Sequence, residues 1–425
     1  MKKVVFSAVD SRMAYSSLGY GAVFSGMQPC DHAWLDGSGA DARPFVVESG
    51  ASLWSYDVIF VSIAWELELP SLVKALRSSG IEPFAARRPA SQPLLVGGGP
   101  LTLSNPNLPG AVCDAVFIGE ADGAFADLNR ALHVATGRED LLSRLAAIPG
   151  MWVPSSGAAC PDPVVAKLPE IPLFSAFPGR DNMFSGSFIV EVGRGCPRGC
   201  AFCVAFGGRR ARFYPSEAIT AQVPDGTSRV GLLGAAVSDH PDLKGIVSTL
   251  RDRGIGVTLG SLRADRVEPD LVSMLAAGGL RTLTVAADGA SESLRKSIHK
   301  GVTADHLIQA ARVARETGIE KVRVYVMLGL PGEQSGDVAE FAGLVNAMAA
   351  ITNVVVSVSP FVPKRFTPLS DAGFAGVGTI RRRISELKRM VRPAVQIRAG
   401  SVKEAEFEHR LSHAEMREIP DLTLS

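Results

Sequence analysis

The sequence has almost no net charge, since 44 Lys and Arg residues against 43 Asp and Glu residues give a formal charge of +1 at pH 7. A chain so balanced has no global field to draw it to nucleic acid or to an acidic membrane surface. It also lacks any run of about 18 uncharged apolar residues, which a membrane-spanning helix needs. Its apolar start is interrupted by Asp10 before it reaches the length of a secretory signal. We therefore expect a cytoplasmic protein with no membrane partner and no nucleic-acid partner.

Cysteine is scarce as well, with six residues in a chain of 425. This is poor material for the disulfide framework of a secreted protein and is better suited to metal or redox chemistry in a reducing compartment. Apolar residues make up 46% of the chain and charged ones only 20%, enough for one large core or two ordinary ones. We expect two folded domains.

The first 153 residues alternate buried-strand patterns with helical periodicity, which is typical of a parallel α/β fold. A helix is expected at residues 69–80 ("LPSLVKALRSSG"). The expected strands are residues 2–8 ("KKVVFSA"), 56–65 ("YDVIFVSIAW"), 93–99 ("PLLVGGG") and 113–121 ("CDAVFIGEA"). The pattern predicts a Rossmann-like, doubly wound sheet that binds ligands at the carboxyl ends of its strands.

Residues 154–185 form a proline-rich linker, because prolines interrupt regular structure at Pro154, Pro161, Pro163, Pro169, Pro172 and Pro178. A second α/β series follows over residues 186–370. Its six expected strands are residues 187–193, 228–237, 255–261, 281–287, 322–329 and 353–360. Six such units predict a partial (βα)6 barrel with its site at the carboxyl ends of the strands. Residues 371–425 have a helical pattern and are expected to form a small helical C-terminal extension.

Three cysteines follow the first strand of this barrel in "VEVGRGCPRGCAFC", with the spacing C-x3-C-x2-C. Three thiolates can hold an iron–sulfur cluster and leave one iron open to a further ligand. A structural zinc site needs four ligands, and the next 30 residues contain no further Cys or His. The alternatives are three unrelated buried cysteines, or a zinc site completed by Cys113, Cys160 or His240.

The motif "CPRGCAFC" at the start of a six-unit partial barrel resembles the radical S-adenosylmethionine (radical SAM) superfamily. "LRADRVEPDLVSML", "LTVAADGASESLRKSIHKG", "VYVMLGLPGE" and "VSVSPFVPKRFTPL" look like the strand-end motifs of one branch. That branch carries an N-terminal cobalamin-binding-type Rossmann domain and includes the cobalamin-dependent radical SAM methyltransferases. "PLLVGGGPLTLSNPNLPGAVCDAVFIGEADGAF" resembles the end of that domain.

The resemblance implies roles for residues of the barrel. Cys196, Cys200 and Cys203 would ligate a 4Fe-4S cluster whose fourth iron binds S-adenosylmethionine. An external electron donor would reduce the cluster, which then cleaves the cofactor to a 5′-deoxyadenosyl radical. The residues implied to bind S-adenosylmethionine are Phe202, Ser261, Arg263 and Asp288. For Arg263 the alternative is a surface ion pair. At Asp288 relatives commonly have the longer glutamate, so its contact with the ligand is a point of departure.

In the first domain, the resemblance implies that cobalamin lies at the strand ends, near Arg12, Ser62, Gly97, Gly98, Gly99, Gly119 and Glu120. The Asp-x-His-x-x-Gly signature of enzymes that ligate cobalt through histidine is absent, and Arg12 occupies the corresponding position. Cobalt would therefore have no histidine ligand from this loop. The alternative is a Rossmann domain that serves as a scaffold and binds no cobalamin.

Two further features have ordinary explanations. His32 lies in a turn-rich stretch beside Cys30 and could be a metal ligand, but a lone exposed histidine is more often neither ligand nor catalyst. Arg209, Arg210 and Arg212 follow the cysteine loop and could neutralise an anionic substrate or the cofactor. A solvated basic edge explains them equally well.

We expect a cobalamin-dependent radical SAM methyltransferase that methylates an unreactive carbon. The alternative is a radical SAM enzyme without cobalamin, either a non-methylating one or a methylthiotransferase. The latter needs a second cluster, for which only Cys30, Cys113 and Cys160 are available upstream. A non-enzymatic iron–sulfur or zinc module is a third class. The substrate, whether a small molecule, a peptide or a protein residue, cannot be deduced from the sequence.

Overall fold

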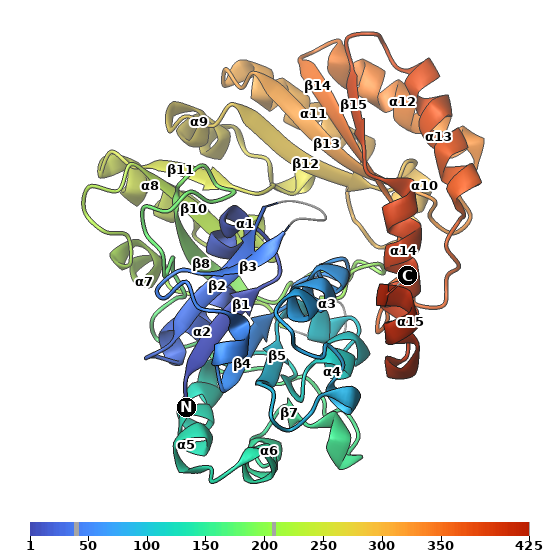
Figure 1. The fold of residues 1–425 in the computed structure, drawn as a ribbon. Coiled ribbons are helices and arrows are strands. Elements are labelled where there is room, and N and C mark those ends of the chain that lie inside the picture. The colour runs from blue at the N-terminus through green and yellow to red at the C-terminus, as the bar shows by residue number, and fades with distance from the viewer. Residues whose placement is uncertain (38–41, 206–209, 425) are drawn as a thin grey trace. The chain divides into compact units, whose positions relative to one another are not determined.

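The computed structural model describes residues 1–37, 42–205 and 210–424 (Figure 1). The chain divides into two compact units. Unit 1 comprises Met1–Pro169, Leu173–Gly186 and Arg410–Ser425, and unit 2 comprises Glu170–Pro172 and Ser187–His409. Within the described ranges, no helix combines the length and the apolar character needed to cross a membrane.

Unit 1 contains a seven-stranded sheet in the order β3-β2-β1-β4-β5-β6-β7. Its strands are β1 (Lys3–Ser7), β2 (Asp31–Asp36), β3 (Arg43–Val46), β4 (Val58–Ser62), β5 (Leu94–Gly98), β6 (Ala115–Phe117) and β7 (Met151–Trp152). The five central strands are parallel, and β3 and β7 are antiparallel to their neighbours. The strand order changes direction between β1 and β4, and such a switch point is where doubly wound sheets bind ligands. The predicted Rossmann-like sheet is confirmed.

The helices of unit 1 are α1 (Ser11–Ser16), α2 (Leu18–Gly26), α3 (Glu68–Ser78), α4 (Asn107–Val112), α5 (Phe125–Val134), α6 (Arg138–Ala146) and α15 (Ile419–Leu424). One face of the sheet forms a core with α1, α2, α5 and α6. The strands read as continuous apolar runs because both faces are covered, and Val4, Val5 and Phe6 are fully buried. The C-terminal segment packs on the unit through Asn105, whose side-chain amide donates to the carbonyls of Leu411 and Ala414.

Part of the proline-rich segment extends unit 1 at the carboxyl end of β6. Val164 forms an isolated parallel bridge with Gly119. The Val164 N–H donates to the carbonyl of Ile118, and the Val164 carbonyl accepts from the N–H of Glu120, at 2.9 and 3.0 Å. The segment therefore pairs with the sheet although its prolines exclude it from longer strands.

Unit 2 contains the six predicted barrel strands, all parallel within their sheets. They are β8 (Phe188–Arg194), β10 (Arg229–Gly234), β11 (Gly256–Leu259), β12 (Thr282–Asp288), β13 (Lys321–Leu328) and β14 (Asn353–Pro360). They form two sheets, in the orders β11-β10-β8-β9 and β12-β13-β14-β15, where β9 is Arg212–Phe213 and β15 is Gln396–Ala399. This is an open partial barrel, as predicted.

The sequence did not reveal β15, which lies within the expected helical extension and pairs in parallel with β14. Its four residues, "QIRA", are mostly exposed, and their polar–apolar alternation is too short to indicate a strand. The rest of that extension is helical, with α13 (Val377–Met390) and α14 (Val402–His413) before α15.

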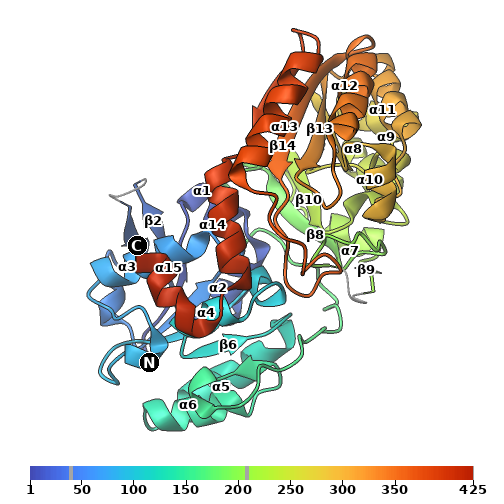
Figure 2. The same cartoon turned by 90° about the vertical axis from the view of Figure 1, so that its right-hand side faces the viewer.

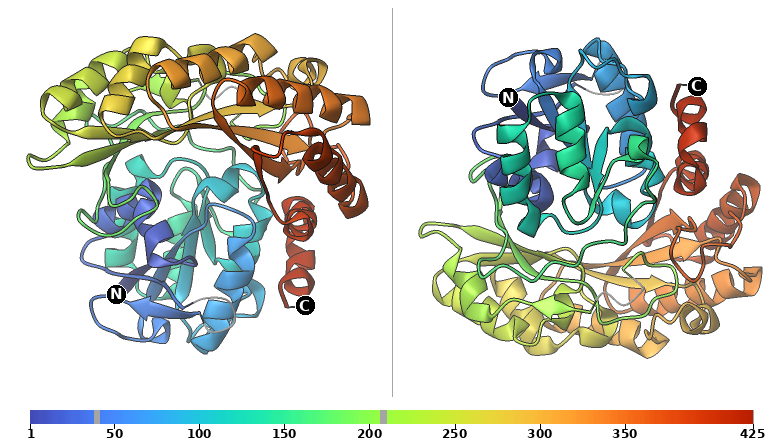
Figure 3. Two further views of the ribbon diagram at one scale, coloured as in Figure 1. Left: turned by 90° about the horizontal axis from the view of Figure 1, so that it is seen from above. Right: turned by 90° about the horizontal axis from the view of Figure 1, so that it is seen from below.

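The other helices of unit 2 are α7 (Ser216–Ala221), α8 (Leu243–Asp252), α9 (Pro269–Ala277), α10 (Glu292–Ser297), α11 (Ala304–Glu316) and α12 (Ser335–Ala349). Helices α8, α9, α11 and α12 form a layer along one side of the strands (Figures 2 and 3). Burial alternates along β12 and β13, with fully buried apolar residues on every second position. These strands thus have one face under the helices and one face that the helices leave uncovered.

Candidate functional site

The three cysteines lie on one loop that begins where β8 ends. Gly195 follows the strand with φ of 72°, a left-handed conformation that favours glycine and turns the chain into the loop. All three thiols are free, with Cys200 buried and Cys196 and Cys203 half-buried. The N–H of Cys203 donates to the carbonyl of Cys200 at 3.1 Å and closes the turn. The predicted ligands are therefore together at the carboxyl end of the first barrel strand.

Ala201 holds this loop through both of its backbone groups. Its N–H donates to the carbonyl of Ile298 at 3.0 Å, directly after α10. Its carbonyl accepts from the N–H of Leu369 at 3.3 Å, in the turn that follows β14. Two segments that are distant in sequence thus fix the backbone between Cys200 and Phe202.

The donor set fits an iron–sulfur cluster. Burial raises the pKa of the Cys200 thiol, which Lys300 and Arg263 oppose, and burial also raises the pKa of the Cys203 thiol. Iron would have to displace these protons, as is usual for thiolate ligands. Among the described residues, no three His, Cys, Asp or Glu side chains could hold a single metal ion. The thiolates of a four-iron cluster bind different iron atoms.

A chain of ion pairs connects the cysteine loop to the ends of the next two barrel strands. Arg198, between the first two cysteines, binds Asp239 through Nη2, and its Nη1 lies 3.9 Å from Oδ2 of Asp265. Asp239 ends the short helix after β10, and Asp265 lies in the short helix after β11. The hydrogen bond to Asp239 raises the pKa of Arg198, which favours the positively charged form of its guanidinium. Arg198 therefore anchors the loop electrostatically.

Arg263 belongs to the same chain of ion pairs. Its Nε lies 2.9 Å from Oδ1 of Asp265, and its Nη2 donates to the carbonyl of Lys300 at 2.9 Å. Arg263 does form an ion pair, but only 12% of its side chain is exposed. The alternative considered from the sequence, an ion pair at the surface, is therefore wrong about where the pair lies. The binding of S-adenosylmethionine by Arg263 stays a prediction, as do the roles of the exposed Ser261 and the half-buried Phe202.

Asp288 ends β12 with φ of 59°, unusual for a residue with a side chain. Its Oδ2 lies 2.5 Å from Nζ of Lys300, and both side chains are largely buried. The pairing register shifts between Ala286 and Asp288, which turns the carboxylate at the strand end. The sequence placed Asp288 at the site but missed Lys300. The sequence gives little indication of Lys300, because this lysine lies in a polar turn twelve residues after Asp288.

Glu333 closes the glycine-rich turn after β13. Both of its carboxylate oxygens accept from the N–H of Gly329, at 3.1 and 3.2 Å. Burial raises the pKa of Glu333 to about 7, although Gly329 and the nearby Arg383 favour the charged form. The Glu333 carboxyl group thus holds a tight connection between β13 and α12.

The glycines expected to surround cobalamin in unit 1 are mostly packed against the chain itself. A Cβ on Gly97 would lie 2.6 Å from Sγ of Cys113, and one on Gly99 would lie 2.5 Å from the carbonyl oxygen of Ile63. At Gly119 the corresponding atom is the carbonyl oxygen of Val164, at 2.3 Å. Close packing of the protein thus accounts for Gly97, Gly99 and Gly119 without a cofactor, and their contact with cobalamin stays a prediction.

The remaining residues of that prediction lie at the strand ends but differ in their surroundings. Arg12 forms an exposed ion pair with Asp181 at 3.0 Å. Glu120 accepts from the N–H of Ala166 at 3.1 Å. Ser62 and Gly98 are register partners at the carboxyl ends of β4 and β5, and a Cβ on Gly98 would meet nothing closer than 3.7 Å. Of the four strand-end glycines, Gly98 is thus the one at which a Cβ would make only ordinary van der Waals contacts.

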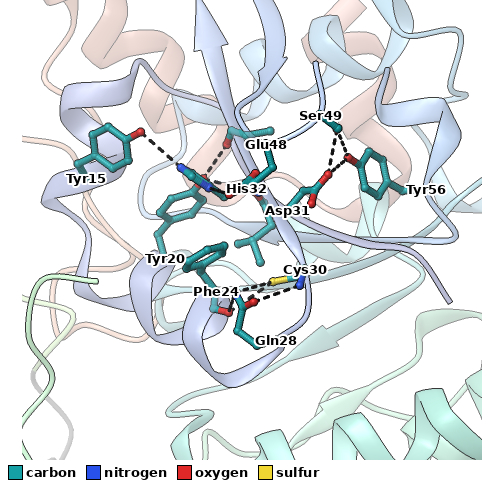
Figure 4. A network of polar contacts seen from close by, with 12 residues as sticks. Tyr15, Tyr20, Phe24, Gln28, Cys30, Asp31, His32, Glu48, Ser49 and Tyr56 are labelled. Carbon is teal, nitrogen blue, oxygen red and sulfur yellow. Dashed lines mark hydrogen bonds and ion pairs between the residues drawn. The ribbon is translucent and has the colours of Figure 1, made fainter. Parts of the chain in front are cut away.

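The expectation that His32 is an exposed loop residue is wrong. It lies on β2, is 6% exposed and packs among Tyr15, Tyr20, Phe24 and other aromatic rings. Its Nδ1 lies 2.5 Å from a carboxylate oxygen of Glu48, and its Nε2 lies 3.4 Å from the Tyr15 hydroxyl (Figure 4). Burial lowers its pKa, which Glu48 opposes. His32 is thus a hydrogen-bonded core residue in unit 1.

Of the three arginines after the cysteine loop, Arg209 lies outside the described residues. Arg210 is exposed, and Arg212 lies on β9, which pairs with the end of β8. Arg212 is therefore part of the sheet, which a solvated basic edge does not describe.

Comparison with known protein families agrees with this geometry. Residues 190–345 match the family described as "Radical SAM superfamily", and residues 37–154 match "Radical SAM proteins, N-terminal". The chain belongs to the radical SAM superfamily. The first match contains the cysteine loop and barrel strands β10 to β13, and the second covers most of the sheet of unit 1.

The chain is also similar in sequence to two curated proteins. An uncharacterized protein of Methanocaldococcus jannaschii is 26% identical over 337 residues, which cover 76% of this chain and 70% of that protein. An uncharacterized methyltransferase of Pyrococcus horikoshii is 25% identical over 268 residues, covering 57% of this chain and 56% of that protein.

Among solved structures, the chain is similar to OxsB, a cobalamin-dependent S-adenosylmethionine radical enzyme whose structure contains aqua-cobalamin and S-adenosylmethionine. The TM-score is 0.56 at 14% sequence identity, and the match covers 93% of this chain and 58% of OxsB. This likeness concerns the fold. The chain spans little more than half the length of OxsB and of the Pyrococcus methyltransferase.

Proposed function

We propose that this radical SAM protein abstracts a hydrogen atom from an unreactive carbon of its substrate. The observation that carries the proposal is the loop of three free cysteines at the carboxyl end of β8, held at Ala201 by two other segments. With a 4Fe-4S cluster and S-adenosylmethionine bound, such a loop supplies a 5′-deoxyadenosyl radical.

The surrounding side chains have the charges that this cofactor requires. Arg263 would bind the carboxylate of S-adenosylmethionine through Nη1, because its Nε and Nη2 contact Asp265 and Nη2 also donates to the carbonyl of Lys300. Asp288 would accept hydrogen bonds at the end of β12, oriented by Lys300. Arg198 would keep the cysteine loop in register with both. The substrate would be a small molecule, a peptide or a protein residue, and an external donor would supply the electron.

The proposal is tested by anaerobic reconstitution with iron and sulfide. We expect about four iron and four sulfide per chain and their loss in Cys→Ala variants at positions 196, 200 and 203. Ser261→Ala keeps the loop intact and serves as the control for cluster content. Stoichiometric zinc without iron would contradict the proposal.

A second candidate is the narrower function of a cobalamin-dependent C-methyltransferase. It is favoured by the switch point between β1 and β4 and by the similarity to OxsB and to a protein named as a methyltransferase. The glycines at positions 97, 99 and 119 add no support, because packing of the protein already accounts for them.

Titration of the protein with hydroxocobalamin separates the two candidates. Retention of one cobalamin per chain, with the spectrum of a detached nucleotide base, supports the methyltransferase. Cluster assembly and cofactor cleavage without cobalamin retention support a radical SAM enzyme whose first unit is a scaffold.

A further inference from the structure

The sheet β12-β13-β14-β15 of unit 2 has two different faces. The face under the helices is apolar, and the face that the helices leave uncovered carries polar side chains. On β13, Val322, Val324 and Val326 are almost fully buried, whereas Arg323 is half-buried and Tyr325 is 38% exposed. Side chains alternate between faces along a strand, so Arg323 and Tyr325 share the face that the helices leave uncovered.

The strand register aligns these residues with polar neighbours. Tyr325 pairs with Ser357 of β14, which pairs in turn with Arg398 of β15. Adjacent strands are about 4.8 Å apart and alternate residues on one strand about 6.6 Å apart. Tyr325, Ser357 and Arg398 therefore form a row across three strands, and Arg323 lies next to that row on the same face.

The two arginines have no partners in the part of the chain that the structure describes. Arg323 and Arg398 form no hydrogen bond or ion pair there, and Nε of Arg323 is fully buried without an acceptor. A buried guanidinium N–H without a partner is costly, because its contact with water is lost and not replaced. Such a group is expected to find its acceptor in a ligand or in water.

The strands of this sheet supply no free carboxylate that could neutralise these charges. Strands β12 to β15 carry one acidic residue, Asp288, and Lys300 already pairs with it. Asp288 is aligned with Val326, one residue beyond Tyr325 toward the carboxyl end of the sheet. The row therefore lies one step below the strand end at which Asp288 and the cysteine loop are found.

We propose that Arg323, Tyr325, Ser357 and Arg398 bind an oxyanion, a carboxylate or a phosphate, of the substrate. Guanidinium groups offer paired N–H donors that match the two oxygens of such a group, and the phenol and hydroxyl add further donors. The anion would orient the substrate so that its reacting carbon extends toward the strand ends. This assignment rests on the proposed radical SAM function.

Calorimetric titration of the full-length reconstituted protein at fixed ionic strength tests the proposal, with succinate and inorganic phosphate as probes. We expect saturable binding of at least one probe, and the tighter probe identifies the kind of oxyanion. Arg323→Gln and Arg398→Gln should each weaken binding about tenfold or more. Arg312→Gln is the matched control, because Arg312 is an exposed arginine of α11.

Several results would overturn the site. The first is the absence of saturable binding of both probes. The second is that Arg312→Gln weakens probe binding as much as the two variants of the site do. The third is that Arg323→Gln lowers the affinity for S-adenosylmethionine and leaves the binding of both probes unchanged. The last result would assign the arginine to the cofactor. Anion binding in a protein that assembles no cluster would refute the radical SAM function and leave an anion site, so the two failures are distinguishable.

Discussion

The ammonium nitrogen of Lys300 lies 2.5 Å from a carboxylate oxygen of Asp288, and neither side chain is more than 15% exposed. Asp288 ends a barrel strand in a left-handed conformation, and Lys300 lies two residues after Ile298, whose carbonyl accepts from the N–H of Ala201 in the cysteine loop. The ion pair thus connects Asp288, which is predicted to bind S-adenosylmethionine, to the segment that holds Ala201.

Removal of Lys300 should leave the Asp288 carboxylate buried and uncompensated. Lys300→Met is expected to lower the free energy of unfolding by about 3 kcal/mol, measured by denaturant unfolding. Lys244→Met is the matched control, because its ion pair with Glu268 has the same 2.5 Å separation but both side chains are about half exposed. That control should have a much smaller effect, because water screens an exposed ion pair. Equal effects would show that Lys300 does not stabilise a buried charge.

Arg198 should affect the cluster and the cofactor together, since it anchors the cysteine loop and shares Asp265 with Arg263. Arg198→Gln is expected to reduce iron content severalfold and to weaken S-adenosylmethionine binding. Arg266→Gln is the control, because Arg266 lies 3.6 Å from the same Asp239 but is outside the loop and 52% exposed. Full iron loading and unchanged affinity in Arg198→Gln would refute the anchoring role.

Because the pKa of Glu333 is raised in the folded chain, we expect the free energy of unfolding to fall as the pH rises. Its folded-state pKa of about 7 exceeds the ordinary 4.5, mainly because of burial, so the folded chain holds this proton more tightly than the unfolded chain. The contribution is complete below about pH 4.5 and is lost as the pH passes 7, up to roughly 3 kcal/mol. Glu333→Gln should be relatively more stable at pH 8 than at pH 5 when compared with the wild type. Parallel pH profiles of the unfolding midpoints would contradict this.

Gly119 and Gly98 provide a matched pair at the strand ends of unit 1. Gly119 has φ of 104°, and a Cβ there would lie 2.3 Å from the Val164 carbonyl oxygen, so Gly119→Ala should cost about 2 kcal/mol or more. At Gly98 the backbone is not left-handed and a Cβ would make only an ordinary van der Waals contact with the Phe117 carbonyl oxygen at 3.7 Å, so Gly98→Ala should cost less than about 1 kcal/mol. Thermal unfolding measures both. An unchanged unfolding temperature in Gly119→Ala would show that the packing of Val164 at this position does not require glycine.

Much of unit 2 could be predicted from the sequence, because each parallel strand is a short apolar run between turn residues. All six barrel strands and the cysteine loop were predicted in this way. Strand β15 could not be, since its four-residue pattern is too short to indicate a strand and the segment pairs with β14 only in the folded chain. The same applies to Arg398, whose place beside Ser357 depends on that register.

The ionic contacts of the site could not be predicted either. Asp265 is two residues from Arg263, yet nothing in the sequence indicates that Arg198, 67 positions earlier, shares it. In unit 1 the glycines were correctly located at strand ends, but the chain's own proline-rich segment, which packs against Gly119, had no strand pattern. Long-range packing of irregular segments therefore limits this type of inference.

Reductive cleavage of S-adenosylmethionine tests the central claim most directly. The reconstituted, reduced wild-type protein is incubated with S-adenosylmethionine, and the products are separated and quantified. We predict 5′-deoxyadenosine and methionine in equal amounts, with neither formed by a variant in which Cys196, Cys200 and Cys203 are all alanine. A protein that carries the full cluster and binds the cofactor but forms no 5′-deoxyadenosine, with or without cobalamin, would contradict the account.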